Sequence, residues 1–384
     1  MATPTLTMIP SGYKAEKVYS VLPTNGDGDF TFNRNDTATR VNKSGLIEQV
    51  ATDIPRLDYS DGSCPSLLLE PSSVNLALYS QDFSQSDWTV FDVSKSANSV
   101  LSPDGTLNAS KLTALSGTNK AFQQLVTVSA DPSNNRVYTG SIYVKSSSVT
   151  SCSLRVGSAT SNNAITITSE WQRFEAQYTL AATFTAVRLG IVLNNEGDEV
   201  DVAFGQVEEK PFATSYIPTT TQTQSRSADS AFKTGLSSYI SSTAGVLYGE
   251  LSTVLNTDFK RISLSDGSNL NRVEFGFDIA SNSLRVIVKD NDNNVINTSI
   301  VISNDITDFL KIAIKYESGD TKVFVNGVLV GSVSTVAFGT IGTMDRLNLS
   351  THDSSDYNFQ GKIRDIRVYN TALTDAKLTT LTTI

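Results

Sequence analysis

The chain has little of the residue types on which metal sites and nucleophilic catalysis depend. Of its 384 residues, one is a histidine and two, Cys64 and Cys152, are cysteines. A single histidine excludes the usual catalytic triads and the zinc sites built from several histidines. Two cysteines in so long a chain make no disulfide framework, so we interpret both as buried or incidental thiols.

Motifs that mark other active sites are also missing. The sequence contains no P-loop, no dinucleotide-binding glycine motif and no nucleophile elbow. The 39 acidic residues could supply a carboxylate pair for glycoside hydrolysis, but no spacing distinguishes one pair. Residues 290–294 resemble the start of a calcium loop, yet Val295 and Val301 stand where Gly and Glu are needed, which favours a hairpin turn. We expect no catalytic residue, no cofactor and no enzyme.

Charge and long apolar runs are scarce as well. Charged residues make up 18% of the chain, and the net charge is −9. Nucleic acids and anionic membranes need a basic surface, so neither is an expected partner. No apolar run approaches the roughly 20 residues that span a bilayer, and the first ten residues lack the pattern of a secretory signal. We expect no membrane insertion, and a protein that remains in the cytosol where it is made.

The first segment, residues 1–74, carries six of the ten prolines and only short β-like pieces. Such a segment cannot bury much core by itself. It could be a flexible leader. Its apolar residues favour the second interpretation, an extended arm that folds against other subunits.

Residues 75–218 alternate between apolar and polar with a period of two, as half-buried strands do. Val187, Leu189, Ile191 and Leu193 form one such face, and 200, 202 and 204 form another. Turn sequences separate the strands, which predicts a jelly-roll sandwich. Residues 219–244 are rich in Thr, Ser and Gln and are predicted to be an interdomain linker or a solvated strand pair.

Residues 245–384 form a third alternating unit. Asn326-Gly327 between two apolar runs predicts a two-residue hairpin with a type I′ turn. A short helix should follow Thr374, with Ala376, Leu378 and Leu381 on its inner side. The predicted fold class is therefore all-β: an extended N-terminal arm, then two antiparallel β-sandwich domains, one jelly-roll and one concanavalin-like.

An ordered series of short phrases runs through the first three-fifths of the chain. The phrases are FTFNR (30–34), ATRVN (38–42), GLI (45–47), PRLDY (55–59), LLLEP (67–71), SQDF (80–83) with Trp88, FGQVE (204–208) and ATSYIPT (213–219). Together they resemble tailed-bacteriophage virion proteins of the head-spike, head-fibre or tail-fibre type.

This resemblance implies a virion protein made in the cytoplasm of a bacterial host. The arm would dock on other phage virion proteins, and the protein would be a homo-oligomer, most simply a trimer. The implied docking residues are Phe30, Phe32, Arg34, Arg40, Leu57, Tyr59 and Leu69. The jelly roll resembles carbohydrate-binding modules, many of which hold a structural Ca²⁺, but residues 202–205 lack the acidic pair that such a site needs.

The last unit has its own resemblance. The VNG hairpin followed by GKIRDIRVYN (361–370) resembles laminin-G-like, concanavalin-type sandwiches. Function in such a sandwich falls to its loops, and the loop 351–360 precedes the final strand. Its glycan-contact candidates are His352, Asp353, Asp356, Tyr357 and Phe359.

The predicted function is thus a non-enzymatic phage structural protein, a head fibre or tail-associated fibre, with outer β-domains that bind a host-surface polysaccharide or decorate the particle. The alternative is an accessory part of a carbohydrate-active enzyme, or a depolymerase with binding modules. Trp88, Trp171, Tyr143 and Tyr178 could contact sugars, but Trp171 and Tyr178 lie in alternating runs, which favours core packing.

Overall fold

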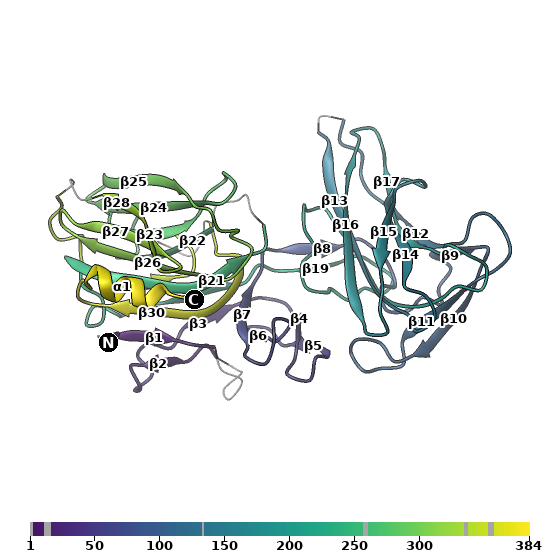
Figure 1. The fold of residues 1–384 in the computed structure, drawn as a ribbon, viewed down its shortest axis with the longest axis horizontal. Helices are drawn as coiled ribbons and strands as arrows, with labels where there is room; N and C mark the ends of the chain where they lie inside the picture. The colour runs from purple at the N-terminus through teal and green to yellow at the C-terminus, as the bar shows by residue number, and fades with distance from the viewer. Residues whose placement is uncertain (1–2, 11–16, 133, 256–259, 334–336, 352–356) are drawn as a thin grey trace. The chain divides into compact units, whose positions relative to one another are not determined.

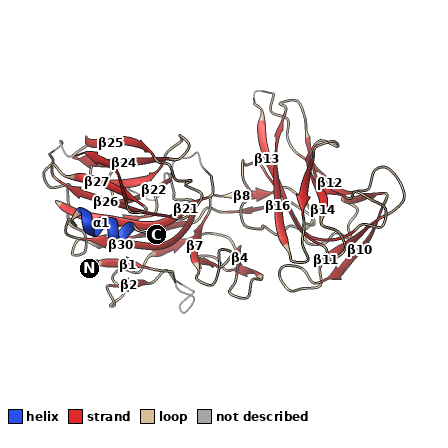
Figure 2. Ribbon diagram, viewed as in Figure 1, coloured by secondary structure: helices blue, strands red, loops and turns tan. Residues whose placement is uncertain are grey.

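The computed structural model describes residues 3–10, 17–132, 134–255, 260–333, 337–351 and 357–384. These residues form thirty strands and one helix, which confirms the all-β prediction (Figure 2). The chain divides into two compact units that do not follow the sequence in order. Unit 1 comprises 1–36, 50–71 and 228–384, and unit 2 comprises 37–49 and 72–227.

Unit 1 is a sandwich of two antiparallel sheets (Figure 1). The nine-stranded sheet runs β2-β1-β30-β21-β26-β27-β28, and β7 joins it by pairing with β30 and β6. Its strands are β1 (Leu6–Met8), β2 (Ser20–Leu22), β6 (Arg56–Asp58), β7 (Ser66–Leu69), β21 (Ala244–Thr253), β26 (Leu310–Glu317), β27 (Thr321–Val325), β28 (Val328–Val333) and β30 (Gly361–Tyr369). The seven-stranded sheet runs β25-β24-β23-β22-β29-β20-β3. Its strands are β3 (Thr31–Asn33), β20 (Ser230–Lys233), β22 (Lys260–Ser265), β23 (Arg272–Phe277), β24 (Ser283–Asp290), β25 (Asn293–Val301) and β29 (Arg346–Asn348).

The core of unit 1 lies between these sheets and follows the predicted alternation. Leu247 and Leu251 of β21 point into it, whereas Val246 and Tyr248 face the other way and pack beneath α1 (Asp375–Thr382). Leu378 and Leu381 of α1 are buried as expected. Ala376 is exposed, and Thr382 takes the third inner position instead.

Both predicted hairpin turns of unit 1 are confirmed. Asn326 and Gly327 have φ of 48° and 83°, and the flanking residues Val325 and Val328 pair directly. Residues 291 and 292 of the calcium-loop-like run also have positive φ and connect β24 to β25. Two left-handed residues match the twist of the strands that they join, which is why Asn, Asp and Gly occupy these turns.

The extended-arm prediction for residues 1–74 is wrong, because the segment folds into its own chain. β1 pairs with β30, β3 pairs with β20, and β7 pairs with the start of β30. Seven of its apolar side chains lie in the core of unit 1, namely Leu6, Met8, Val18, Phe30, Phe32, Leu67 and Leu69, and Ile47 packs in unit 2. The sequence correctly indicated that the segment is too apolar for a linker. The residues that cover its apolar side chains, however, belong to the same chain.

The seven proposed docking residues are accordingly buried, or are engaged in contacts, within their own chain. Phe30, Phe32, Leu57 and Leu69 are buried. Tyr59 is half-buried. Arg40, in unit 2, forms an ion pair with Glu48, and Arg34 belongs to a buried charge network described next.

Four charged side chains form this network inside unit 1. Asp229 accepts a hydrogen bond from Nη1 of Arg34 at 3.2 Å and one from Nη2 of Arg56. Nη1 of Arg56 also bonds Glu70 at 2.5 Å, and the backbone N–H of Glu70 donates to Asp229 at 2.8 Å. The side chains of Arg34, Arg56 and Asp229 are completely shielded from solvent. Burial alone would lower the pKa of Arg56, but Asp229 and Glu70 raise it, so the guanidinium stays charged.

Unit 2 is a second sandwich, of two five-stranded antiparallel sheets ordered β10-β11-β18-β13-β16 and β15-β14-β17-β12-β9 (Figure 1). Their strands are β9 (Trp88–Phe91), β10 (Val93–Val100), β11 (Ala109–Ala114), β12 (Ala121–Thr127), β13 (Arg136–Lys145), β14 (Ser151–Gly157), β15 (Asn162–Thr166), β16 (Gln172–Leu180), β17 (Ala186–Val192) and β18 (Glu199–Glu208). Two ribbons complete the unit: β4 (Ala38–Val41) with β5 (Ile47–Val50), and β8 (Ser73–Asn75) with β19 (Gln224–Arg226). The predicted linker 219–244 is therefore wrong in part, since β19 belongs to unit 2 and β20 to unit 1.

The predicted alternating rows of β17 and β18 are confirmed except at Phe204. The face formed by Val187, Leu189, Ile191 and Leu193 is buried. Val200 and Val202 point into the same core, but Phe204 does not. Phe204 has φ of 56°, and the pairing of β13 with β18 shifts register nearby. The extra residue turns Phe204 to the opposite face, where it stacks on Tyr216 at 4.5 Å.

The opening and closing phrases of unit 2 bind each other. Nδ2 of Asn75 donates to the carbonyls of Gly205 and Ile217, and its Oδ1 accepts from the N–H of Val207. The hydroxyls of Ser80 and Tyr216 lie 2.6 Å apart. These polar residues satisfy buried backbone groups where the chain enters and leaves the sandwich. These contacts give the opening and closing sequence phrases of unit 2 a structural role.

Candidate functional site

A pocket of about 290 Å³ opens at one end of the unit 1 sandwich, and we name it the rim pocket. It is lined by Asp61, Ser252, Thr253, Val254, Thr307, Asp308, Phe309, Gly361 and Lys362. These residues come from the end of β21, the turn before β26, the start of β30 and the β6–β7 hairpin. The predicted glycan loop 351–360 leads into this end through Gly361.

The floor of the rim pocket is the close pair of β21 and β30. Thr253 pairs with Gly361, which has φ of 148°. A Cβ on Gly361 would lie 2.0 Å from the carbonyl oxygen of Ser252, so only glycine allows this approach. The hydroxyls of Ser252 and Thr253 are thereby held on a fixed backbone.

One wall is the turn that precedes β26. The Asp305 carboxylate accepts hydrogen bonds from both the N–H and the hydroxyl of Thr307, each at 2.9 Å. These bonds lower the pKa of Asp305 and keep it ionised. The turn presents Thr307 and Asp308, both exposed, beside the half-buried Phe309.

The opposite wall carries an ion pair. Nζ of Lys362 lies 2.7 Å from Oδ2 of Asp61 and 3.4 Å from Oδ1 of Asp58. It also donates to the hydroxyl of Ser60 at 2.6 Å. The Lys362 charge is therefore neutralised by the hairpin, and the pocket has no excess of positive charge.

Phe309 supplies the aromatic surface. The guanidinium carbon of Arg364 lies 3.6 Å from the centroid of its ring, a cation–π contact that fixes the ring. Arg364 is held in turn by Glu250 at 3.9 Å. A fixed ring beside hydroxyls and carboxylates can hold a sugar, because the ring packs on C–H groups and the polar groups bond hydroxyls.

Acid–base catalysis at the rim pocket has less support than sugar binding. Desolvation raises the pKa of three described carboxyls, Asp201, Glu274 and Asp365, of which Glu274 and Asp365 belong to unit 1. None of the three lines the rim pocket. A raised carboxyl pKa is what a general acid for glycoside cleavage requires.

The sequence-predicted glycan candidates fall into three groups. His352, Asp353 and Asp356 lie outside the described residues. Tyr357 is exposed, with φ of 50°, and its carbonyl accepts from the N–H of Arg261 at 3.1 Å. Phe359 is 1% exposed and packs near Phe277, so its assignment as a glycan contact is wrong. The alternating pattern of the sandwich already directs the side chain of Phe359 toward the core.

Sequence reasoning missed the residues that line the rim pocket. Asp305-x-Thr307 is a turn signal directly before a strand, and it could have drawn attention to Phe309. Asp61 carried no such signal, because its approach to Lys362 depends on the pairing of β7 with β30. Of the four aromatic candidates, Trp88 lies in the core, since its ring stacks on Phe122 at 5.0 Å and is 1% exposed. Tyr143, Trp171 and Tyr178 are half-buried and pack against the core clusters of unit 2.

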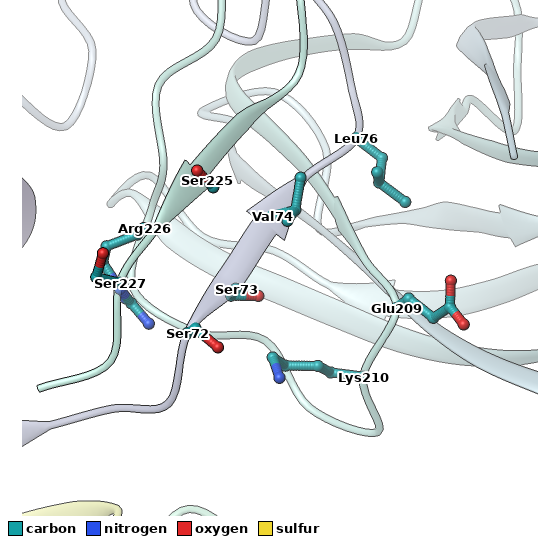
Figure 3. A pocket seen from close by; sticks show the side chains of 9 residues that line it. All are labelled: Ser72, Ser73, Val74, Leu76, Glu209, Lys210, Ser225, Arg226 and Ser227. Atoms are coloured by element: carbon teal, nitrogen blue, oxygen red, sulfur yellow. The ribbon is translucent and has the colours of Figure 1, made fainter. Parts of the chain in front are cut away.

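Unit 2 has a larger pocket of about 360 Å³, beside the β8–β19 ribbon (Figure 3). Figure 3 shows four serines around it, with Val74, Leu76, Glu209, Lys210 and Arg226. Several of its polar groups are already used by the fold. The hydroxyl of Ser73 bonds Glu208 at 2.5 Å, and Nη1 of Arg226 bonds Ser215 at 2.8 Å. The rim pocket is therefore the better candidate for a ligand.

Within the ranges that the structure describes, no three His, Cys, Asp or Glu side chains come together as metal ligands. In the same ranges, no helix has the length and apolar character needed to cross a membrane.

Comparison with known proteins identifies the fold of the last part of the chain. Residues 252–379 match the profile of the Concanavalin A-like lectin/glucanases superfamily, Laminin_G_3. Unit 1 thus contains a laminin-G-like, concanavalin-type domain, as the sequence predicted. No curated protein sequence matches the chain.

Several solved structures are remotely similar. The CBM40 of the Ruminococcus gnavus IT-sialidase, bound to α2,3-sialyllactose, is 18% identical over 38% of this chain and 84% of that chain, with a TM-score of 0.33. Domain 4 of AbnA, a GH43 extracellular arabinanase from Geobacillus stearothermophilus in complex with arabinotriose, is 17% identical over 40% and 73%, with a TM-score of 0.32. A SAP-like pentraxin from Limulus polyphemus is 13% identical over 37% and 70%, with a TM-score of 0.31.

Proposed function

We propose that this protein is a non-enzymatic attachment protein of a tailed-bacteriophage virion, and that unit 1 binds a host-surface polysaccharide in the rim pocket. One observation carries the binding proposal. The pocket combines a fixed aromatic ring, hydroxyls and an exposed carboxylate at the loop end of a domain that matches a lectin and glucanase superfamily.

The ligand that fits best is a neutral sugar or a weakly charged one. Asp61 neutralises Lys362, and Asp308 adds an exposed negative charge, so a strongly anionic sugar would be repelled. Each contact should be weak, because sugar hydroxyls exchange water hydrogen bonds for nearly equal ones. One site should bind no tighter than roughly millimolar to micromolar, and useful attachment requires many copies.

Support for the virion location comes from the ordered sequence phrases that resemble phage virion proteins. The folded N-terminal segment changes how docking would work, since its apolar residues are used inside unit 1. Docking would then use the exposed surface of a folded unit. Electron microscopy of intact particles with labelled protein tests the location, and light scattering tests the expected trimer.

The binding test uses the full chain, because unit 1 needs its N-terminal strands. Multivalently presented protein is applied to a glycan array together with Phe309→Ala and Asp308→Asn. We expect the neutral-glycan signal to fall about two- to tenfold in Phe309→Ala, the loss expected for one aromatic stacking contact. Phe184→Ala is the matched control, since Phe184 is an exposed phenylalanine of unit 2.

An unchanged signal in Phe309→Ala, or no signal from the wild-type protein, would overturn the rim-pocket assignment. Release of reducing ends from a bound polysaccharide would overturn the non-enzymatic part and favour a depolymerase.

A further inference from the structure

Unit 2 has a distinctive distribution of charge between its two sheets. The five strands β9, β12, β14, β15 and β17 contain two charged residues, Arg155 and Arg188, and no Asp, Glu or Lys. The opposite sheet carries both signs, including Glu199, Asp201 and Lys111. A sheet with only positive charge is unexpected in a chain of net charge −9.

The two arginines lie on the same face of this sheet. Across β14 and β17, Arg155 pairs with Gly190, and Gly157 pairs with Arg188. They are therefore diagonal neighbours, about 7–8 Å apart at the backbone. Val187, Leu189 and Ile191 of β17 point into the core, so Arg188 points away from it.

The Arg155 guanidinium is held in place by neutral partners. Its Nε donates to Oδ1 of Asn162 at 2.9 Å, and its Nη1 donates to Oε1 of Gln123 at 2.8 Å. It crosses Gly190, where a Cβ would meet the carbonyl oxygen of Phe122 at 2.1 Å. Arg188 has no ion-pair partner among the described residues.

The charge of Arg155 is therefore not neutralised within the protein. Burial, and then the like charge of Arg188, lowers its pKa. Arg155 is only 6% exposed, so an anion would contact the half-buried Arg188 and would offset the repulsion between the two guanidinium groups. A guanidinium also matches a carboxylate geometrically, through paired N–H donors.

Apolar and amide groups lie on the same face as the two arginines. Leu125 pairs with Arg188, and Phe91 pairs with Ala121 on the edge strand, diagonal to Gln123, with 51% and 42% of their surfaces exposed. Gln123 and Asn162 add amide groups. An aromatic ring, amides and fixed guanidinium groups together suit a sugar that carries a carboxylate.

We propose that this face, which we name the arginine face (Phe91, Gln123, Leu125, Arg155, Asn162 and Arg188), binds an acidic polysaccharide through the carboxylates of its uronic acids. Nucleic acid fits less well, because two cations on an acidic protein neutralise too few phosphates. The site is separate from the rim pocket and does not depend on it.

The test measures binding of the full chain to immobilised polygalacturonate and to neutral dextran, at low and at physiological ionic strength. We expect binding to polygalacturonate but not to dextran, and a loss of at least about tenfold in Arg188→Gln, as for one charge-assisted hydrogen bond. Arg188→Lys should recover part of it, because charge returns without the planar fork. Lys43→Gln is the matched control, since it removes one positive charge from the β4–β5 turn of the same unit and should change nothing.

Calorimetric melting of each variant shows whether unit 2 stays folded. Wild-type binding that Arg188→Gln leaves intact, an equal loss in Lys43→Gln, or no wild-type binding would overturn the proposal. So would equal competition by single-stranded DNA, which would mean a general anion surface. Phe309→Ala should retain polygalacturonate binding, so failure of the rim pocket and failure of the arginine face can be told apart.

Discussion

Removal of the Asp229 carboxylate tests how much the buried charge network contributes to the stability of unit 1. Asp229 accepts hydrogen bonds from Arg34, Arg56 and the backbone of Glu70, and no solvent reaches these groups. In Asp229→Ala, Arg34 loses its carboxylate and Arg56 keeps only Glu70. Breaking a buried ion pair by removing one partner costs about 3–5 kcal/mol, because the remaining charge is left desolvated.

The effect should be confined to unit 1. For a unit of about 200 residues, this loss lowers the melting temperature by roughly 6–20 °C. Differential scanning calorimetry should show the unit 1 transition shifting down while the unit 2 transition stays in place. Asp229→Asn keeps one acceptor oxygen, so its unit 1 melting temperature should lie between those of the wild-type protein and Asp229→Ala.

A matched control is the half-exposed pair of Arg40 and Glu48 in unit 2, 2.7 Å apart. Glu48→Gln should change stability by at most about 1 kcal/mol, as exposed pairs do. The reasoning fails if Asp229→Ala costs no more than Glu48→Gln, or if both units lose stability together. Replacing the whole network by neutral residues, in Arg34→Met, Arg56→Met, Glu70→Gln and Asp229→Leu combined, should recover part of the loss.

Three further predictions concern the chain ends, pH and the rim pocket. A chain that begins at Val74 lacks five strands of unit 1, whereas unit 2 loses the β4–β5 ribbon and one residue of β8 but keeps both of its five-stranded sheets. Limited proteolysis should therefore degrade unit 1 faster than the sandwich of unit 2, and a protease-resistant unit 1 would contradict the observed pairing. Hydrogen bonds from Ser84 and Gln85 lower the pKa of Asp82 to about 2 from its ordinary 3.8, so its contribution to stability is complete above 3.8 and lost as pH falls toward 2. Urea unfolding at neutral and acid pH should therefore show a smaller acid loss in Asp82→Asn, and an equal loss would exclude this role. Gly361→Ala should destabilise unit 1 by about 1–3 kcal/mol and weaken glycan binding, and unchanged unfolding would show that β21 and β30 can separate freely.

Sequence patterns predicted the parts of the fold that depend on local periodicity. The alternating rows in both sandwiches, the Asn326-Gly327 hairpin and the position of α1 all follow from neighbouring residues. Phe204 departs from its row because a bulge reverses the side-chain direction, and an alternating sequence contains no signal for one extra residue in a pair.

Long-range pairing explains the remaining differences. Apolar residues such as Phe30 and Leu69 require burial, but their sequence does not say whether the same chain or another subunit covers them. The rim pocket was missed for the same reason, since Asp61 meets Lys362 only after β7 pairs with β30. Phe359, which the sequence placed among the glycan contacts, belongs to the core of the sandwich.

The division of unit 1 along the chain has a consequence for biosynthesis. The hydroxyl of Thr5 bonds the carbonyl of Val368, 363 residues later, so the first strand waits for its partner while all of these residues are translated. At about 5–20 residues per second, that delay lasts roughly 20–70 s. Unit 2 can fold during this time, while the first strands remain open to chaperones or to a neighbouring nascent chain. Two chains that exchanged these strands would form an interlocked dimer with every native pair intact, so dense polysomes would favour such exchange and slow initiation would limit it.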